Sequence, residues 1–246
     1  MTISSKTVAV LGGTSGIGFA VARGARAAGA DVVIGSLAQA DVSVALDRLN
    51  GEAGPPVRGA AVDVTSEDSL AAFFAEAGPF DHLAVSVGDP LKPVPFLEQT
   101  TEQARKNFEI RFWGQRAAVR QAVPHLRPGG SITLTTGLAG RRATPGITVL
   151  GAVCGAVESL VYGLAVELAP LRINVVCPGV VDTGIWNALP EDRRAALYAG
   201  MERNLPVGRV GKPEDLAEAY LYLMRNGYST GTVVVSDGGA FQAPAH

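Results

Sequence analysis

Short apolar runs rich in valine, alanine and isoleucine recur along the chain, and longer segments of mixed apolar and polar residues separate them. The runs have the length of buried β-strands, and the intervening segments have the length and composition of helices. The predicted strands are Thr7–Leu11, Asp31–Ser36, Val57–Val64, His82–Val87, Ser131–Thr136, Arg172–Val176 and Thr232–Val235. This alternation predicts an α/β fold with a doubly wound, seven-stranded parallel sheet that carries helices on both faces.

Three predicted helix starts carry a capping residue or a proline followed by acidic residues, which the positive end of a helix dipole favours. They lie at Thr65–Asp68, Thr100–Glu102 and Pro213–Asp215. No repeat or low-complexity linker interrupts the series, so we expect a single domain over residues 1–246. Within it, the less regular stretch at about 180–212 is predicted to form a lid over a substrate pocket.

The segment Gly151–Ala169 is apolar nearly all round, which is typical of a helix that is covered on every side. Either the same subunit or a second chain covers it, and the sequence leaves both alternatives open. Glu158, Glu167 and several glycines interrupt the apolar stretch Ile147–Leu168. They favour a packed helix over a membrane span.

Charge and cysteine content narrow the class of partner. The formal net charge is −2, and there is no basic stripe for nucleic acid and no polybasic patch for a membrane. Cys154 and Cys177 have neither CxxC spacing nor nearby histidines, so no metal site is expected. The first residues show no export signal, and we expect a cytoplasmic protein that binds small molecules.

A glycine-rich turn follows the first predicted strand and leads into a helix. Its glycines allow a sharp bend and close approach of a ligand, and the helix start offers free N–H groups and a positive dipole end. The turn therefore favours a diphosphate, although a purely structural role is the alternative. A P-loop is excluded, because no Gly-Lys-Ser/Thr sequence follows. The residues expected to hold the diphosphate are Gly12, Thr14, Ser15, Gly16, Ile17 and Gly18.

The end of the second predicted strand bears on the choice of nucleotide. NAD-type sites carry an acidic residue about 20 residues beyond the glycine turn, where it binds the adenosine ribose. This chain has Ser36 at the end of that strand, and a serine does not repel a 2′-phosphate. Leu37 supplies no arginine for that phosphate. The missing carboxylate predicts NADP(H) in preference to NAD(H).

Across essentially its whole length the chain resembles the short-chain dehydrogenase/reductase (SDR) family. Its turn is similar to the family's Thr-Gly-x-x-x-Gly-Ile-Gly sequence, with Leu11 in place of the threonine, and Ser236–Gly239 is similar to the C-terminal signature. The resemblance implies a Rossmann-like fold, a nicotinamide dinucleotide and a homo-oligomer, either a tetramer or a dimer. Each motif alone also has a structural interpretation. The contacts that the resemblance implies are Asp63 and Val64 at the adenine, Ser86 and Gly88 after the fourth strand, and Pro178, Gly179 and Thr183 at the nicotinamide.

The resemblance also identifies where the family carries its Asn-Ser-Tyr-Lys catalytic tetrad. Those positions fall on Arg111, Gly137, Leu150 and Cys154, so the sequence predicts that all four reactive side chains are missing. Hydride transfer to a carbonyl group develops an alkoxide, which needs a donor near the operating pH. The nearest tyrosine, Tyr162, lies more than three helical turns beyond Leu150, so a shift of register does not restore the tetrad.

Substitute groups are available, and each has a structural alternative. Arg111 is suited to stabilise an oxyanion or a substrate carboxylate, or to form a salt bridge. Asp89 is suited to exchange a proton if burial raises its pKa, or to cap a loop. Further candidates are the Thr136 hydroxyl, the Cys154 thiol, which also suits inert packing, and the loop residues Arg141 and Arg142, which favour an anionic ligand or remain solvated.

Three functions remain open from the sequence, and the catalytic residue stays unassigned. The first is an NADP(H)-dependent oxidoreductase that acts on a small carbonyl, imine or activated alkene through a non-standard proton donor. The second is a protein without catalytic activity that keeps its nucleotide for sensing, assembly or scaffolding. The third is a lyase or isomerase that uses the pocket without net hydride transfer.

Overall fold

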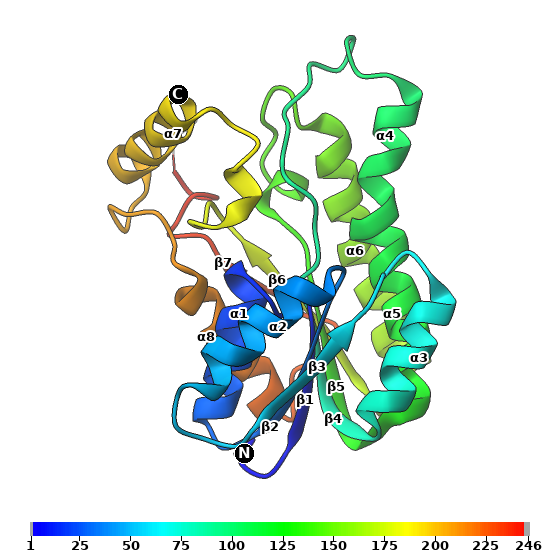
Figure 1. Cartoon of the computed structure of the whole chain (residues 1–246). Helices are drawn as coiled ribbons and strands as arrows, with labels where there is room; N and C mark the ends of the chain where they lie inside the picture. The colour runs from blue at the N-terminus through cyan, green and yellow to red at the C-terminus, as the bar shows by residue number, and fades with distance from the viewer. Residues whose placement is uncertain (1, 244–246) are drawn as a thin grey trace.

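In a computed structural model, which describes residues 2–243, seven parallel strands form one twisted sheet in the order β3-β2-β1-β4-β5-β6-β7 (Figure 1). The predicted sheet is confirmed. The order reverses between β1 and β4, and this is the point at which doubly wound sheets bind ligands. The strands are β1 (Thr7–Leu11), β2 (Asp31–Ser36), β3 (Val57–Ala61), β4 (Phe80–Val85), β5 (Leu126–Thr135), β6 (Arg172–Pro178) and β7 (Val233–Ser236).

Helices cover both faces of the sheet (Figure 1). Val8 and Val10 of β1 pack toward α1, α2 and α8, whereas Ala9 and Leu11 pack toward α3, α5 and α6. This alternation is the period of a strand that is buried on both sides. The α-helices are α1 (Gly16–Ala27), α2 (Gln39–Asn50), α3 (Glu67–Ala77), α4 (Thr101–Phe108), α5 (Gln115–Ala122), α6 (Thr148–Glu167), α7 (Glu191–Asn204) and α8 (Pro213–Arg225). Shorter turns are η1 (Glu109–Gly114), η2 (Val123–His125), η3 (Leu138–Gly140) and η4 (Gly184–Trp186).

The three predicted helix starts are confirmed. Ser66 Oγ accepts a hydrogen bond from the Ser69 N–H at 3.2 Å, at the start of α3. Thr100 forms a capping box with Gln103 before α4. At α8 the Asp215 carboxylate accepts the main-chain N–H that precedes the helix, at 2.8 Å. Each bond satisfies a donor that the first turn of a helix leaves free.

Several segments differ from the sequence prediction. β4 spans Phe80–Val85 instead of His82–Val87, and β5 begins at Leu126 instead of Ser131. β3 ends at Ala61 instead of Val64 because the Asp63 carboxylate accepts the Thr65 N–H at 2.8 Å and turns the chain toward α3. The expected irregular stretch at 180–212 contains the fourteen-residue helix α7. No residue of α7 is buried, so it lacks the apolar stripe from which a helix is predicted.

Helix α6 corresponds to the predicted apolar helix. Val153, Val157 and Val161 are buried against the sheet, while Tyr162 and Val166 are 48% and 79% exposed. Among the described residues it is the one helix long and apolar enough to cross a membrane by length and composition. The same chain covers one face of α6 and leaves the opposite face open.

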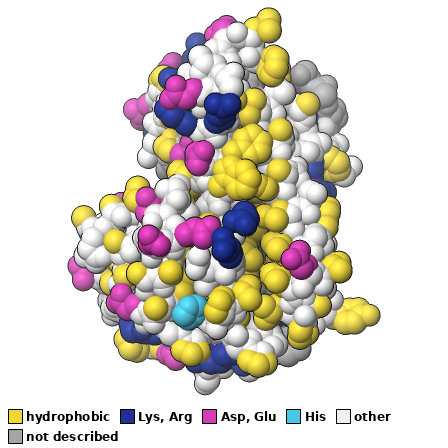
Figure 2. Space-filling model, turned by 90° about the vertical axis from the view of Figure 1, so that its right-hand side faces the viewer, with side chains coloured by type: hydrophobic (Ala, Val, Ile, Leu, Met, Phe, Trp, Pro, Cys, Tyr) yellow, Lys and Arg dark blue, Asp and Glu magenta, His cyan; other side chains and the backbone are white. Residues whose placement is uncertain are grey.

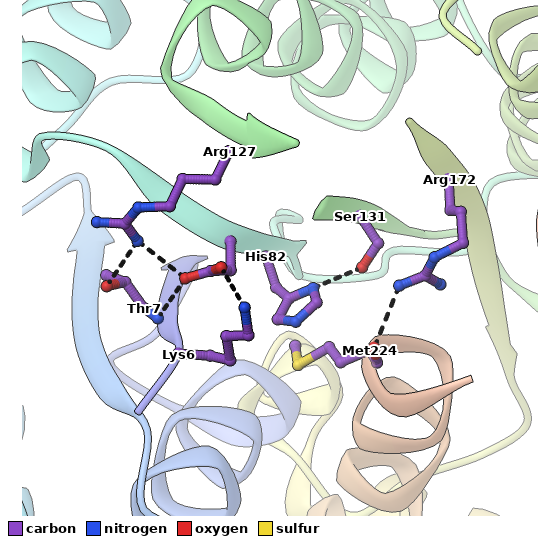
Figure 3. Close-up of polar contacts among 8 residues, drawn as sticks. Lys6, Thr7, His82, Arg127, Ser131, Arg172 and Met224 are labelled. Carbon is purple, nitrogen blue, oxygen red and sulfur yellow. Dashed lines mark hydrogen bonds and ion pairs between the residues drawn. The ribbon is translucent and has the colours of Figure 1, made fainter. Parts of the chain in front are cut away.

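At the amino-terminal edge of the sheet, a buried carboxylate of β4 is bonded to β1, to β5 and to Lys6, which precedes β1 (Figure 3). Asp81 of β4 is 5% exposed, and it accepts the Thr7 N–H at 2.9 Å, Lys6 Nζ at 3.0 Å and Arg127 Nη1 at 2.8 Å. Burial acts to raise the pKa of Asp81, but the three donors outweigh burial and lower this pKa below its usual value. The carboxylate is therefore a structural anchor.

Two further side chains complete this edge (Figure 3). His82 Nδ1 lies 2.9 Å from Ser131 Oγ, which ties β4 to β5. Burial, followed by the charge of Arg172, lowers the pKa of His82 to about 4. Arg172 donates to the carbonyls of Leu223 at 2.7 Å and Met224 at 3.1 Å, at the end of α8. It thereby satisfies carbonyl groups that a helix leaves without partners at its carboxyl end.

Candidate functional site

The predicted cofactor residues lie at the opposite, carboxyl edge of the sheet. They follow five of its strands, and the carboxyl ends of parallel strands meet at one edge. The residues are Gly12–Gly18 after β1, Ser36 at the end of β2, Asp63 and Val64 after β3, Ser86 and Gly88 after β4, and Pro178–Thr183 at and after β6. The fold therefore gathers all the positions that the sequence analysis assigned to the nucleotide.

The glycine turn is packed closely against the end of β4. Gly12 has a φ of +80°, and a Cβ there would lie 2.2 Å from the Ser86 carbonyl oxygen. A Cβ on Gly18 would lie 2.1 Å from the Gly12 carbonyl oxygen. The turn requires these two glycines for its own packing, and it also fits a diphosphate.

The start of α1 provides the donors for such a diphosphate. The first hydrogen bond of the helix runs from the Phe19 N–H to the Ser15 carbonyl, at 3.1 Å. No side chain caps this end, because Ser15 forms no side-chain capping bond. The N–H groups of the first turn are therefore free to meet an anion, and the helix dipole favours one there.

The predicted 2′-phosphate position is a pair of hydroxyl groups. Thr14 Oγ1 donates to Ser36 Oγ at 3.1 Å, so the hydroxyl at the end of β2 is joined to the glycine turn. Leu37 points outward and is 71% exposed. The two hydroxyl groups carry no negative charge that would oppose a phosphate.

The remaining nucleotide positions have structural contacts of their own. The Asp63 carboxylate accepts both the N–H and the hydroxyl of Thr65, at 2.8 and 2.7 Å. The Gly179 N–H donates to the Ser236 carbonyl at 3.1 Å. Thr183 lies beside the glycine turn, next to Gly16. The structure thus brings these residues to one edge, and their contact with a cofactor stays a prediction.

A pocket beside this edge is lined by Arg111 and Leu150, two of the four residues that the sequence analysis assigned to the tetrad positions. The space between its walls is about 340 Å³, counted together with the solvent into which the pocket opens. Polar side chains from the β4–α4 loop and from α4 line one side, and apolar residues before and within α6 line the other. Its lining includes Asp89, Lys92, Gln99, Asn107, Ile147 and Val149.

Arg111 and Asp89 form an ion pair in this pocket. Arg111 Nε lies 3.0 Å from Asp89 Oδ1, and Arg111 Nη2 donates to the Asp89 carbonyl oxygen. The arginine side chain is 15% exposed and the aspartate is 40% exposed. A Cβ on Gly88 would lie 2.9 Å from Arg111 Nη1, so a glycine allows the guanidinium to lie against the chain. The salt bridge expected from the sequence is present, and it lies in the pocket wall.

Gly137 and Cys154, which the sequence analysis assigned to the other two tetrad positions, lie against each other and form no reactive pair. A Cβ on Gly137 would contact Cys154 Sγ at 3.4 Å. Burial raises the pKa of the Cys154 thiol, which suits packing and opposes its use as a nucleophile. The Thr136 hydroxyl donates to the Cys154 carbonyl at 2.9 Å. Thr136 and Cys154, both candidates for a substitute reactive group, therefore join the end of β5 to α6.

The loop arginines are bonded within the chain, and neither is a solvated loop residue. Arg141 forms a bidentate ion pair with Glu158 of α6, with Nε at 3.0 Å from Oε1 and Nη2 at 2.9 Å from Oε2. The hydrogen bond to Glu158 raises the pKa of Arg141. Arg142 donates to the Ala240 carbonyl. These bonds fix the loop after β5 and the carboxyl-terminal segment.

Main-chain hydrogen bonds join three loops around the pocket. The Leu91 N–H of the β4–α4 loop donates to the Ile185 carbonyl in η4, at 2.9 Å. The Val94 N–H of the same loop donates to the Gly146 carbonyl before α6, at 2.8 Å. The first part of the predicted lid region is therefore bonded to the pocket wall, and its movement stays a prediction.

The sequence analysis missed one polar residue next to the pocket. Gln115 is 1% exposed and follows η1, a π-helical turn that contains Arg111. A π-turn inside an α-helix often marks a functional site. The available signal was the helical spacing of Gln115 with the apolar residues Ala118, Val119 and Ala122, which places it on the buried face of α5, but the π-turn itself leaves no pattern in the sequence.

Known proteins are similar to this chain in both sequence and fold. A family model described as Enoyl-(Acyl carrier protein) reductase matches residues 12–240. A short-chain dehydrogenase/reductase of Gibberella fujikuroi is 34% identical over 96% of this chain and 95% of that protein. A crystal structure of a small-chain dehydrogenase in complex with NADPH is 33% identical, with a TM-score of 0.82 over 97% of this chain and all of that one.

Two other solved structures bear on the chemistry. MalC reductase/Diels-Alderase from Malbranchea aurantiaca is 32% identical, with a TM-score of 0.89 over 96% of each chain. An NADPH-bound short chain oxidoreductase of Pseudomonas aeruginosa PAO1, described as containing an atypical catalytic center, is 28% identical. Its TM-score is 0.87 over 97% of this chain and 98% of that one. These similarities extend over the sheet, the glycine turn and the pocket, and the chain belongs to the short-chain dehydrogenase/reductase family.

Proposed function

We propose that this protein is an NADP(H)-dependent reductase in which Arg111 replaces the tyrosine-centred machinery of the family. The observation that carries the proposal is the pocket at the carboxyl edge of the sheet. Arg111 and Leu150 line that pocket together, with no tyrosine or histidine in its lining. The candidate reaction centre thus offers a fixed cation and an apolar wall.

The cofactor preference rests on the turn and on the end of β2. The first turn of α1 is suited to hold the diphosphate, and the Thr14–Ser36 pair is suited to receive a 2′-phosphate. When bound, the cofactor supplies the hydride. The NADPH-bound relatives support this choice.

Arg111 is suited to stabilise negative charge on a substrate oxygen. Its guanidinium carries a permanent charge, and Asp89 holds two of its nitrogens in place. A preorganised cation in a partly dry pocket lowers the energy of a developing oxyanion. A guanidinium group is suited to stabilise charge and not to act as a general acid.

Among the carbonyl, imine and activated-alkene substrates, the pocket favours the activated alkene. Hydride addition to the β-carbon of an α,β-unsaturated carbonyl moves the electron pair of the double bond to give an enolate oxygen. The enolate is less basic than an alkoxide, and its α-carbon later takes a proton from water. The pocket holds two cations, Arg111 and Lys92, against one carboxylate, Asp89, which favours an enolate over a cationic iminium group.

The test is NADPH consumption with a panel of 2-cyclohexen-1-one, cyclohexanone and 3,4-dihydroisoquinoline, after NADPH binding has been measured by fluorescence. We expect turnover that is highest with the enone. Bound NADPH with no turnover of any compound, at high enzyme concentration, would overturn the reductase proposal.

A second candidate function does not involve redox chemistry. Gly137, Leu150 and Cys154 leave no serine, tyrosine or lysine at three tetrad positions, which is compatible with a nucleotide kept for sensing, assembly or scaffolding. The reductase/Diels-Alderase relative bears the name of a reaction without hydride transfer, and this supports the lyase or isomerase alternative. A NADPH-dependent change in assembly, without turnover, would favour the first of these alternatives.

We further propose that the protein is a cytoplasmic homo-oligomer, a dimer or a tetramer, that binds neither nucleic acid nor membrane. Trp113, Tyr162 and Val166 are exposed on or beside α6. Figure 2 shows a band of hydrophobic side chains across the face that carries α4, α5 and α6. Light scattering coupled to gel filtration measures the mass, and a mass of one subunit at micromolar concentration would refute the assembly.

A further inference from the structure

The helix that carries Arg111 changes its winding at that residue. Helices α4 and α5 run on either side of η1, whose π-helical geometry departs from the usual i to i−4 bonding. The Gln115 N–H, which an α-helix would direct to the Arg111 carbonyl, donates to the Phe112 carbonyl instead.

The side chain of Gln115 bonds both to the Arg111 carbonyl and to the end of β5. Its Nε2 donates to the Arg111 carbonyl at 2.6 Å and to the Thr135 carbonyl at 2.8 Å. Its Oε1 accepts the Thr135 N–H at 3.0 Å. Both donors and the acceptor of a buried amide are thus bonded to main-chain atoms of two elements.

Thr135 ends β5, and further bonds tie it to the sheet edge. Its hydroxyl donates to the Val85 carbonyl at 2.5 Å and is hydrogen bonded to the Tyr220 hydroxyl. Gly137 lies two residues beyond Thr135. Through Gln115, the main chain of Arg111 is therefore held at a set position relative to the ends of β4 and β5, at the same edge of the sheet as the predicted cofactor residues.

We propose that Gln115 is a positioning residue that sets the place of the Arg111 guanidinium by fixing the π-turn to β5. The inference rests on the proposed role of Arg111. Displacement of a catalytic group by about 1 Å costs up to about 100-fold in rate, so loss of the clamp has a measurable effect.

The variants are Gln115→Met, which keeps the length and removes all three bonds, and Gln115→Glu, which keeps an acceptor for Thr135 and removes the donors. Gln121→Met is the matched control, because Gln121 lies on the same helix and donates only to Glu67 of α3. The first readout is proton–nitrogen NMR of the Arg111 Nε–H. Arg26 Nε–H, which donates to the Pro55 carbonyl at 2.7 Å, is the internal reference.

We expect the exchange of the Arg111 Nε–H with water to rise at least about tenfold in both variants, while Arg26 and the Gln121→Met protein stay unchanged. The kcat with NADPH and 2-cyclohexen-1-one should fall about 10- to 100-fold, with the KM for NADPH within about twofold. In an Arg111→Met background, Gln115→Met should lower kcat no further.

If the Gln115 variants melt at a lower temperature but exchange the Arg111 Nε–H with water at an unchanged rate, Gln115 stabilises the fold without positioning Arg111. That result would overturn the inference. So would a full further loss of kcat in the Arg111→Met background. If the unmodified protein reduces no probe, the proposed function fails alone, because the NMR readout needs no substrate. If Gln115→Met does not fold, Gln115→Glu carries the same comparison.

Discussion

The two edges of the sheet use polar groups in different ways. At the amino edge, Asp81 accepts three hydrogen bonds, and Arg172 covers the end of α8. At the carboxyl edge, the first turn of α1 has free N–H groups, and the Arg111–Asp89 pair lines a pocket. Polar groups that are fully bonded within the chain stabilise the fold, whereas those with bonding capacity left are available to a ligand. The comparison predicts that changes at one edge alter stability and changes at the other alter chemistry.

The largest expected effect is at the carboxyl edge. Arg111→Met keeps the length of the side chain and removes its charge, so kcat with NADPH and 2-cyclohexen-1-one should fall about 100-fold or more. The affinity for NADPH and the urea midpoint should change little. Arg120→Met is the control, because Arg120 is an exposed arginine of α5 paired with Glu67. Full activity in the Arg111 variant would remove this arginine from the mechanism.

The next effect lies at the amino edge. Asp81→Leu leaves the Thr7 N–H without its acceptor and frees Lys6 and Arg127, both half exposed, to return to water. We expect about 2–3 kcal/mol less free energy of unfolding in urea, with kcat per folded molecule unchanged. A loss of NADPH affinity in the folded variant would contradict the separation of the two edges.

A pH dependence sharpens the same comparison. His82 has an ordinary pKa of 6.5, and its pKa in the fold is about 4, so the unfolded chain binds a proton that the folded one does not. Above pH 6.5 His82 is neutral in both states and does not lower the free energy of unfolding. As the pH falls from 6.5 toward 4, the unfolded chain takes up the proton and the free energy of unfolding decreases. We expect the His82 contribution at pH 5 to be about 2 kcal/mol smaller than at pH 7.

Urea unfolding of the protein and of His82→Gln at both pH values measures this term. In His82→Gln, the free energy of unfolding should not show the part of its decrease between pH 7 and pH 5 that comes from His82. Asp81 does not interfere, because its lowered pKa affects stability only near and below its ordinary value of 3.8. An equal slope in both proteins would assign the acid sensitivity to another group.

The smallest expected effect concerns the nucleotide. Ser36→Asp places a carboxylate beside Thr14, where the 2′-phosphate is expected, and should weaken NADPH binding about tenfold while leaving NADH binding unchanged. Ser36→Asn adds volume without charge and is the control. Equal weakening by both substitutions would point to crowding, and equal weakening of NADH would place the effect away from the phosphate.

The sequence predicts the strands and the helix starts because their signals are local. Apolar runs mark β1, β2 and β4, and Ser66 and Thr100 act within one helical turn. It also predicts which residues gather at the carboxyl edge, since strand ends in a parallel sheet share an edge. These predictions need no knowledge of distant contacts.

The parts that the sequence could not supply depend on distant partners. Arg141 and Glu158, Gln115 and Thr135, and the π-turn around Arg111 each join elements that are separated along the chain. The hydroxyl of Thr136 was a candidate for chemistry until the fold placed it on the Cys154 carbonyl. Helix α7 was missed because none of its residues is buried.

The bonds that join the loops around the pocket affect how the substrate specificity of this protein can change when lining residues are substituted. Both the Leu91–Ile185 and the Val94–Gly146 bonds run between main-chain atoms, so they do not depend on the identity of any side chain. Substitutions among the lining residues can therefore reshape the pocket while its frame persists. The loops can thus keep one architecture through successive changes of substrate, with the frame inherited and the lining free to vary.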